Sequence, residues 1–226
     1  MRRYVVVEGL IGAGKTSLCR LLQEAWGARL VLEPAETNPF LELFYTDPDQ
    51  YALPVQLYYL MSRWRQQVEI RQGDLFTDIV VSDYLFAKDR VFAEKTLQDD
   101  ELEIYDRFAG VLGGQAPVPD LVVLLDAPTS VLLKRIAKRK APGEHAITVE
   151  YLDDLRGRYK RLFADWTHCP VLRIDNRDMN YVNDPDGRSA VLHRIESVLK
   201  VDNDPRAPGS DSDREAQPNL FGTGSS

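Results

Sequence analysis

Residues 9–16 read Gly-Leu-Ile-Gly-Ala-Gly-Lys-Thr and match the full pattern G-x-x-x-x-G-K-[ST]. An apolar run at 4–7 precedes the pattern, and a segment with helical apolar spacing follows it from Ser17. Glycines between a strand and a helix let backbone N–H groups approach phosphate oxygens closely. The pattern therefore predicts a phosphate-binding loop and constrains the chain to an α/β fold built around it.

The loop predicts a nucleoside triphosphate ligand such as ATP. Lys15 is suited to reach the β- and γ-phosphates, and the Thr16 hydroxyl is suited to ligate Mg²⁺. The adjacent helix N-terminus adds partial positive charge. The residues expected to contact the triphosphate are Gly9, Leu10, Ile11, Gly12, Ala13, Gly14, Lys15, Thr16 and Ser17.

Strand and helix patterns alternate along the chain. Short apolar runs with polar flanks indicate buried strands at 29–33, 79–82, 121–126 and 171–175. Helical patterns occupy 52–72, 97–112, 129–139, 149–166 and 189–200. Together with the first strand they predict a five-stranded parallel sheet with helices on both faces, a three-layer fold of the phosphate-loop NTPase type. Ligands are then expected at the carboxyl ends of the strands.

Composition predicts one domain over 1–201, followed by a disordered acidic tail over 202–226 that has almost no apolar residues. The net charge of −7 argues against nucleic acid as the main partner. Cys19 and Cys169 make no disulfide framework, and Cys19 is expected in the core. The chain has neither a cleavable-signal pattern nor an apolar run of membrane-spanning length, which favours the cytoplasm.

Two predicted strands end at carboxylates. Glu33 closes the second strand, where it is either the base that accepts a substrate hydroxyl proton or a solvated loop acid or helix cap. Asp83 closes the third, where it either holds Mg²⁺ through water or, with Ser82 as the other candidate, caps a helix.

A basic cluster ends the helix predicted at 129–139 and is followed by Pro142-Gly143-Glu144. Cations at a helix C-terminus complement the helix dipole in many proteins. Beside a phosphate loop we favour a mobile lid whose arginines stabilise the transferring phosphoryl group. The basic residues are Lys134, Arg135, Lys138, Arg139 and Lys140.

These segments together resemble the deoxynucleoside kinase family over about residues 3–200. Glu33-Pro34 resembles a family motif whose glutamate is the base for the 5′-hydroxyl. Phe44-Tyr45-Thr46-Asp47-Pro48 resembles a segment whose tyrosine holds the sugar 3′-hydroxyl. Gln56 and Ser62-Arg63 resemble a base-reading glutamine and an arginine near the base. Without this resemblance, the position of Gln56 is typical of the polar face of a long helix.

The resemblance continues towards the C-terminus. Asp89-Arg90 and Phe92-Ala93 resemble a segment in which an aspartate reads the base and a phenylalanine stacks on it, although Phe92 alone is equally typical of core packing. Arg135-Ile136, Arg139 and Glu144 resemble the family lid, where arginines grip phosphates and the glutamate holds the 3′-hydroxyl. Ile147 and Glu150-Tyr151-Leu152 match the start of the next helix, and Asp175 to Tyr181 resembles the loop around the donor adenine. The resemblance also implies a homodimer through paired helices.

The chain departs from the family pattern at several positions. Ser82-Asp83-Tyr84 stands where the family has Glu-Arg-Ser, so Asp83 replaces the glutamate and the arginine is missing. Lys88 and Arg90 are the candidates to supply its charge. Asn38 and Ala141 stand where a tryptophan and a second lid arginine are common, and one gap is needed to align Asp89. The base pocket is therefore not assigned to a particular nucleoside.

The resulting hypothesis is a deoxynucleoside kinase that transfers the γ-phosphoryl group of ATP to a 5′-hydroxyl, with Mg²⁺ as cofactor. Glu33, Lys15, Arg135 and Arg139 are its predicted catalytic residues, and Thr16 and Asp83 its metal ligands. One alternative is a nucleoside monophosphate kinase resembling thymidylate kinase. Such an enzyme would require an arginine directly after Asp83 to bind the acceptor phosphate. The other is a weakly active, nucleotide-binding regulatory subunit.

The tail contains Gln217-Pro218-Asn219-Leu220-Phe221, which resembles peptides that dock on the bacterial replication sliding clamp. Two apolar anchors on a flexible tether suit a hydrophobic pocket. Gln72-Gly73-Asp74-Leu75-Phe76 fits the same pattern inside the predicted domain, so the pattern is weak and an inert tail is the alternative.

Overall fold

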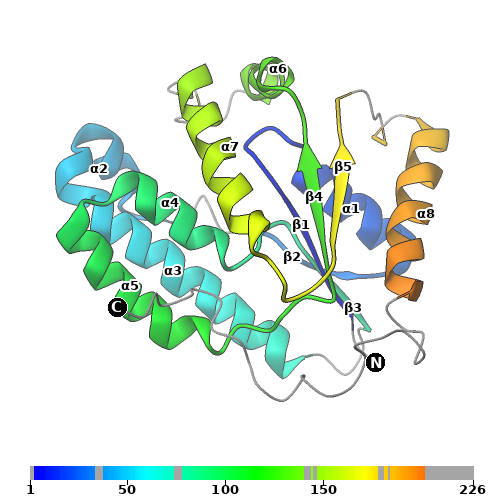
Figure 1. Ribbon diagram of the computed structural model, residues 1–226, viewed down its shortest axis with the longest axis horizontal. Helices are drawn as coiled ribbons and strands as arrows, with labels where there is room; N and C mark the ends of the chain where they lie inside the picture. Colours follow the sequence, from blue (N-terminus) through cyan, green and yellow to red (C-terminus); the bar gives the residue numbers. More distant parts are fainter. Residues whose placement is uncertain are drawn as a thin grey trace.

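The computed structural model describes residues 3–33, 38–73, 78–139, 144, 147–177, 181–182 and 184–201. Five parallel strands form one sheet in the order β2-β3-β1-β4-β5, which confirms the predicted sheet (Figure 1). The strands are β1 (Arg3–Gly9), β2 (Arg29–Val31), β3 (Ile79–Ser82), β4 (Leu121–Asp126) and β5 (Val171–Asp175). Pro34, Ala141 and the whole tail segment 217–221 lie outside the described residues.

Eight helices surround the sheet in the described ranges. They are α1 (Lys15–Trp26), α2 (Leu41–Thr46), α3 (Pro48–Gln72), α4 (Lys88–Thr96), α5 (Asp99–Gly113), α6 (Thr129–Arg139), α7 (Val149–Ala164) and α8 (Pro185–Val201). Helices α1 and α8 lie on one side of the sheet, and α3, α4, α5 and α7 lie on the other (Figure 1). Within the described residues, no helix is long and apolar enough to cross a bilayer.

The core explains why the strand sequences are apolar on both faces. Val5, Val6 and Val7 in the central strand β1 have no exposed surface, because helices cover both sides of the sheet. Cys19 is buried in α1, as expected, and neither Cys19 nor Cys169 is part of a disulfide among the described residues. Parallel strands bring their carboxyl ends to one edge, so the ends of β1, β2 and β3 meet there.

The segment between β3 and β4 differs from the predicted single helix. Leu97 is extended (φ −91°, ψ 148°), and Gln98 with Glu101 forms a capping box that starts α5. The helix predicted at 97–112 is therefore present as α5, and α4 before it is a helix that was not predicted. The short helix α2, which buries none of its residues, was not predicted either. β2 ends at Val31, two residues before the predicted limit.

Candidate active site

The phosphate loop has the backbone that its glycines allow. Gly9, Gly12 and Gly14 have φ values of 147°, 81° and 95°, a region that favours glycine. A Cβ atom on Gly9 would lie 2.4 Å from the carbonyl oxygen of Leu125, and one on Gly14 would lie 2.6 Å from the Tyr181 hydroxyl. No side chain caps the N-terminus of α1 at Gly14, so its first N–H groups remain available to an anion.

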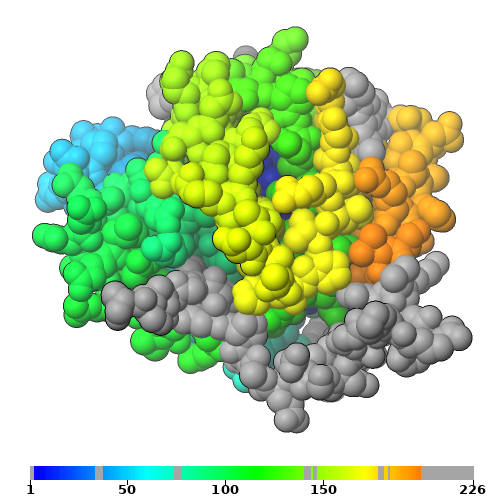
Figure 2. Space-filling view, in the orientation of Figure 1, coloured from blue at the N-terminus to red at the C-terminus, as the bar shows by residue number. Residues whose placement is uncertain are grey.

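Lys15 folds back over this loop. Its Nζ donates to the carbonyl oxygens of Gly9 at 2.8 Å and Leu10 at 3.2 Å. Burial, followed by the charge of Lys88, lowers the pKa of Lys15. Figure 2 shows dark blue atoms of the N-terminal part of the chain in a hollow beside α7. Ile11, Gly12, Gly14 and Lys15 are each partly exposed, so the loop is reachable from the surface.

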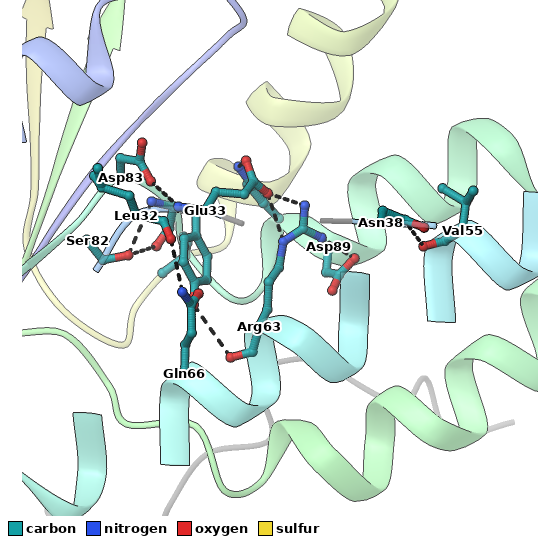
Figure 3. A network of polar contacts seen from close by, with 12 residues as sticks. Leu32, Glu33, Asn38, Val55, Arg63, Gln66, Ser82, Asp83 and Asp89 are labelled. Atoms are coloured by element: carbon teal, nitrogen blue, oxygen red, sulfur yellow. Dashed lines mark hydrogen bonds and ion pairs between the residues drawn. The ribbon is translucent and has the colours of Figure 1, made fainter. Parts of the chain in front are cut away.

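Asp83 joins the ends of two strands to α1. Its Oδ2 accepts from the Thr16 hydroxyl at 2.8 Å, and its Oδ1 accepts from the backbone N–H of Glu33 at 2.8 Å (Figure 3). The alternative that Asp83 or Ser82 caps a helix is wrong, because α4 begins only at Lys88 with Ala87 before it. The predicted metal ligands Thr16 and Asp83 are thus brought together.

Glu33 lies between two cations (Figure 3). Its Oε1 accepts from Arg63 Nε at 2.9 Å and from Nη2, and its Oε2 accepts from Lys88 Nζ at 3.0 Å. Burial alone would raise the pKa of Glu33, but Lys88 and Arg63 outweigh it and hold that pKa well below its usual range. Glu33 is therefore an ionised carboxylate in the site and neither a solvated loop acid nor a helix cap.

This ion cluster predicts a pH-dependent contribution to stability. A carboxylate whose pKa is lower in the folded state stabilises the fold above its unfolded pKa, about 4.3, and loses this contribution as pH falls through its folded pKa. We expect the difference in Tm between wild type and Glu33→Gln to be constant from about pH 8 to 5 and to narrow below about pH 4. Thermal unfolding across this range measures it. A difference that widens on acidification would contradict the pairing.

A second buried polar group lies between α3, α4 and α5. Arg63 Nη1 is 2.5 Å from Asp89 Oδ1, and Asp89 has no exposed surface. Burial raises the pKa of Asp89, although Arg63 opposes the shift. Gln56 Nε2 donates to the Thr96 hydroxyl at 3.3 Å. Figure 3 shows Arg63 between Glu33 and Asp89, so one guanidinium connects the two carboxylates.

Several buried polar atoms in this region have no hydrogen-bond partner among the described residues. They are Gln56 Oε1, Asp89 Oδ2 and the Tyr105 hydroxyl, whereas Arg63 Nη1 and Asp89 Oδ1 pair with each other. Buried groups of this kind are costly unless a ligand or water satisfies them. Sequence reasoning missed Tyr105, because its place in α5 reads as an ordinary core position. The cluster has the donors and acceptors that a base edge requires.

The remaining predicted substrate contacts are Phe92, Tyr45 and Glu144. Phe92 is half-buried against the core with Lys88 Nζ 5.8 Å from its ring centroid, so it both packs and faces the site. Tyr45 is 52% exposed on α2. Glu144 accepts from Arg139 Nε at 3.1 Å. Residues 140–143 and 145–146 of the predicted lid lie outside the described ranges.

Residues that follow β5 contact the phosphate loop. Asn176 Nδ2 donates to the Ala13 carbonyl oxygen, and the Tyr181 hydroxyl donates to that of Gly14 at 3.1 Å. Arg135 Nη2 donates to the carbonyl oxygen of Asn176 at 2.8 Å. The predicted Asp175 is exposed and accepts from the N–H of Arg177. Its neighbour Asn176, which was not singled out within the segment 175–181, bonds the phosphate loop instead.

Comparisons with known proteins identify the family of this chain. The family model for deoxynucleoside kinases matches residues 5–200. A deoxyguanosine kinase of Bacillus subtilis (strain 168) is 30% identical over 202 residues, which cover 87% of this chain and 98% of that protein. A deoxyadenosine/deoxycytidine kinase of the same organism is 28% identical, covering 86% of this chain and 92% of that protein.

Solved structures support the fold. A deoxyadenosine kinase from M. mycoides with bound dATP has a TM-score of 0.72 and 20% sequence identity, and the match covers 86% of this chain and 100% of that one. At this identity the likeness concerns the fold alone, the phosphate-loop NTPase type that the loop pattern predicts. The family match over most of the chain and the relatives of similar length lead to one conclusion: the chain belongs to the deoxynucleoside kinase family of ATP-dependent phosphotransferases.

Proposed function

We propose that Glu33 is the base that accepts the 5′-hydroxyl proton of a deoxynucleoside while the γ-phosphoryl group of ATP is transferred to that oxygen. One observation carries this assignment. The Glu33 carboxylate is held ionised by Arg63 and Lys88, and its own backbone is tied to Asp83, which bonds the phosphate-loop residue Thr16. A base must lie within reach of the hydroxyl and beside the phosphoryl donor, and this connection of Glu33 to the phosphate loop supports that role.

The phosphate end of the site has groups of the right charge. Residues 9–17 would hold the triphosphate through backbone N–H groups, and Lys15 would exchange the carbonyls of Gly9 and Leu10 for phosphate oxygens. Arg135 and Arg139 would stabilise charge on the transferring group. Arg135 already lies beside the phosphate loop through Asn176, and its Nη1 is buried without a hydrogen-bond partner among the described groups. Asp175 would lie near the donor base.

Thr16 and Asp83 would hold Mg²⁺, which supplies positive charge to the phosphates. A hydroxyl and a carboxylate oxygen 2.8 Å apart suit a cation that prefers oxygen ligands and keeps several waters. The described residues contain no group of three or more His, Cys, Asp and Glu side chains suited to a metal, so phosphate and water would complete the coordination. The site fits Mg²⁺ held jointly with the nucleotide.

This assignment makes Asp83→Asn informative. The amide keeps the shape of the side chain but removes its charge, so we expect the Mg²⁺ concentration for half-maximal activity to rise about 10–100-fold. Titration of Mg²⁺ at saturating ATP measures the change, and Asp153→Asn, at an exposed acid of α7, serves as control. An unchanged Mg²⁺ requirement would remove Asp83 from the metal site.

The acceptor would lie on the other side of Glu33. Gln56, Asp89 and Arg63 would bind the edge of the base, and Phe92 would stack on its ring. The base would then supply hydrogen-bond partners to the buried polar atoms that lack one. Tyr45 and Glu144 would bind the sugar 3′-hydroxyl. Because the relatives are named for deoxyguanosine, deoxyadenosine and deoxycytidine, we expect turnover among these bases.

A substrate panel tests the proposed function against its alternatives. ATP consumption by the purified chain with Mg²⁺ is measured with the four deoxynucleosides, the matching ribonucleosides and thymidine monophosphate. Turnover with deoxynucleosides is expected. Turnover with thymidine monophosphate alone would favour a nucleoside monophosphate kinase, which Tyr84 in place of an arginine argues against. Nucleotide binding without turnover would favour a regulatory subunit.

A homodimer through paired helices forms part of the proposal. Three apolar side chains of α5 are exposed at helical spacing, Ile104 at 44%, Phe108 at 53% and Val111 at 72%, and Met61 of α3 is 38% exposed. Such a stripe is typical of an interface. We expect the wild type to elute at about twice the 25.7 kDa of one chain and Phe108→Glu/Val111→Glu at one chain. Equal elution of both proteins would contradict this interface.

A further inference from the structure

We propose that Lys88 is a catalytic residue of this chain, whose ammonium is held on Glu33 before the donor binds and moves onto the γ-phosphoryl group when the donor binds. The proposal rests on the proposed function, since it concerns the same site. The sequence has no arginine directly after Asp83, and Lys88 and Arg90 were both candidates to supply that positive charge. The proposal selects Lys88.

The placement of Lys88 is unusual for a lysine. It is the first residue of α4, is only 3% exposed, and its Nζ lies 3.0 Å from Glu33 Oε2. Lys88 Nζ also lies 5.8 Å from the ring centroids of both Tyr84 and Phe92. Lysine is almost never buried without a partner, and its flexible stem can deliver the charge to a new partner nearby.

A second ammonium group lies close to the first. It belongs to Lys15, whose Nζ donates to the phosphate-loop carbonyls of Gly9 at 2.8 Å and Leu10 at 3.2 Å. Like charges in a partly desolvated site repel, and an anion that binds between them relieves the cost. The ligand of the phosphate loop is such an anion. The Glu8 carboxylate also interacts with both lysines, and it accepts from the Tyr159 hydroxyl at 2.9 Å and from the Leu85 N–H at 3.2 Å.

The other candidates point elsewhere. Arg90 pairs with Glu94 and, at 2.9 Å, with Asp106, on the outer side of α4. Tyr84 stands directly after Asp83, but its hydroxyl donates to Gln66 Oε1 at 2.7 Å and therefore faces α3. Among the groups considered for the missing charge, Lys88 is the one that the fold directs to Glu33.

In the transfer step a bond forms between the acceptor 5′-oxygen and the γ-phosphorus, and the bond from that phosphorus to the bridging oxygen breaks, with ADP as leaving group. The hydroxyl proton goes to Glu33. Lys88 exchanges the Glu33 carboxylate for a phosphoryl oxygen, and Glu33 keeps its hydrogen bond from Arg63.

Turnover of Lys88→Met and Lys88→Arg tests this role. We expect Lys88→Met to lower kcat roughly 10²–10³-fold with the KM for the deoxynucleoside within about threefold, because charge on the transferring group is lost. Lys88→Arg is expected to stay within about tenfold of wild type. Lys95→Met is the matched control, since Lys95 also lies on α4 and pairs with Asp154 at the surface. If Lys88→Met does not fold, Lys88→Gln takes its place.

Equal losses in the Met and Arg variants, or wild-type kcat in Lys88→Met, would overturn the proposal. A binding measurement separates this outcome from failure of the proposed function. By calorimetry with Mg²⁺, we expect the preference for ATP over ADP to fall about tenfold in Lys88→Met and to persist in Lys95→Met. A preserved preference in Lys88→Met would overturn the γ-phosphoryl contact. If Lys88→Met lost the preference for ATP over ADP while the wild type phosphorylated no deoxynucleoside, the γ-phosphoryl contact of Lys88 would be supported. The deoxynucleoside would then be rejected as the acceptor.

Discussion

Glu33→Gln is expected to lower kcat for deoxynucleoside phosphorylation by roughly 10²–10⁴-fold, the usual contribution of a positioned base. Glutamine has nearly the same shape but cannot accept the hydroxyl proton. The KM for the deoxynucleoside should stay within a few-fold, because Gln56 and Asp89, the residues proposed to read the base, lie on other elements. Steady-state kinetics at saturating ATP measures both constants.

Glu103→Gln is the matched control for this variant. Glu103 is an exposed acid of α5 that pairs with Arg107 at the surface, and its loss should leave kcat unchanged. If Glu33→Gln retained wild-type kcat, the assignment of Glu33 as base would be wrong. A large rise in KM with an unchanged kcat would instead make Glu33 a substrate-binding residue.

Arg63→Met is expected to have the largest effect on stability. Arg63 is 4% exposed and pairs with Glu33 and with the fully buried Asp89. Removing it leaves a buried carboxylate without its cation, which costs about 3–5 kcal/mol. For a chain of this size the Tm should fall by roughly 10 °C. Thermal unfolding at neutral pH measures the loss.

A second substitution separates charge from packing in this result. Replacing Asp89 as well, in Arg63→Met/Asp89→Leu, removes the uncompensated carboxylate and should recover part of the lost stability. Arg107→Met, at an exposed arginine of α5, should leave the Tm unchanged. A loss below about 1 kcal/mol for Arg63→Met would show that water reaches Asp89 and that the pair is not desolvated.

The parts of the site that one segment carries could be predicted from the sequence. The phosphate loop combines its glycines, Lys15 and Thr16 within eight residues, and the sheet follows from the alternation of strands and helices. Glu33 and Asp83 were candidates because they follow strands, and parallel strands end at one edge. Their hydrogen-bonded connection depends on that shared edge, and the fold confirms it.

The remaining parts depend on the rotation and ends of elements that no pattern indicated. Lys88 and Arg90 are two residues apart on α4, so they point about 200° apart around the helix, and only the packing of that helix selects Lys88. Asn176 reaches the phosphate loop by a turn after β5. Tyr105 is recognisable only by its unpartnered hydroxyl beside Asp89. None of these contacts has a periodic signal.

The transfer of phosphate to a 5′-hydroxyl beside Glu33 is tested most directly by identifying the product. The purified chain is incubated with ATP, Mg²⁺ and a deoxynucleoside, or with the same nucleoside lacking its 5′-oxygen, and the products are identified by phosphorus NMR. We expect a 5′-monophosphate from the deoxynucleoside and no phosphorylated nucleoside from the analogue. Phosphorylation of the analogue, or ADP formation without any nucleotide product, would contradict the account.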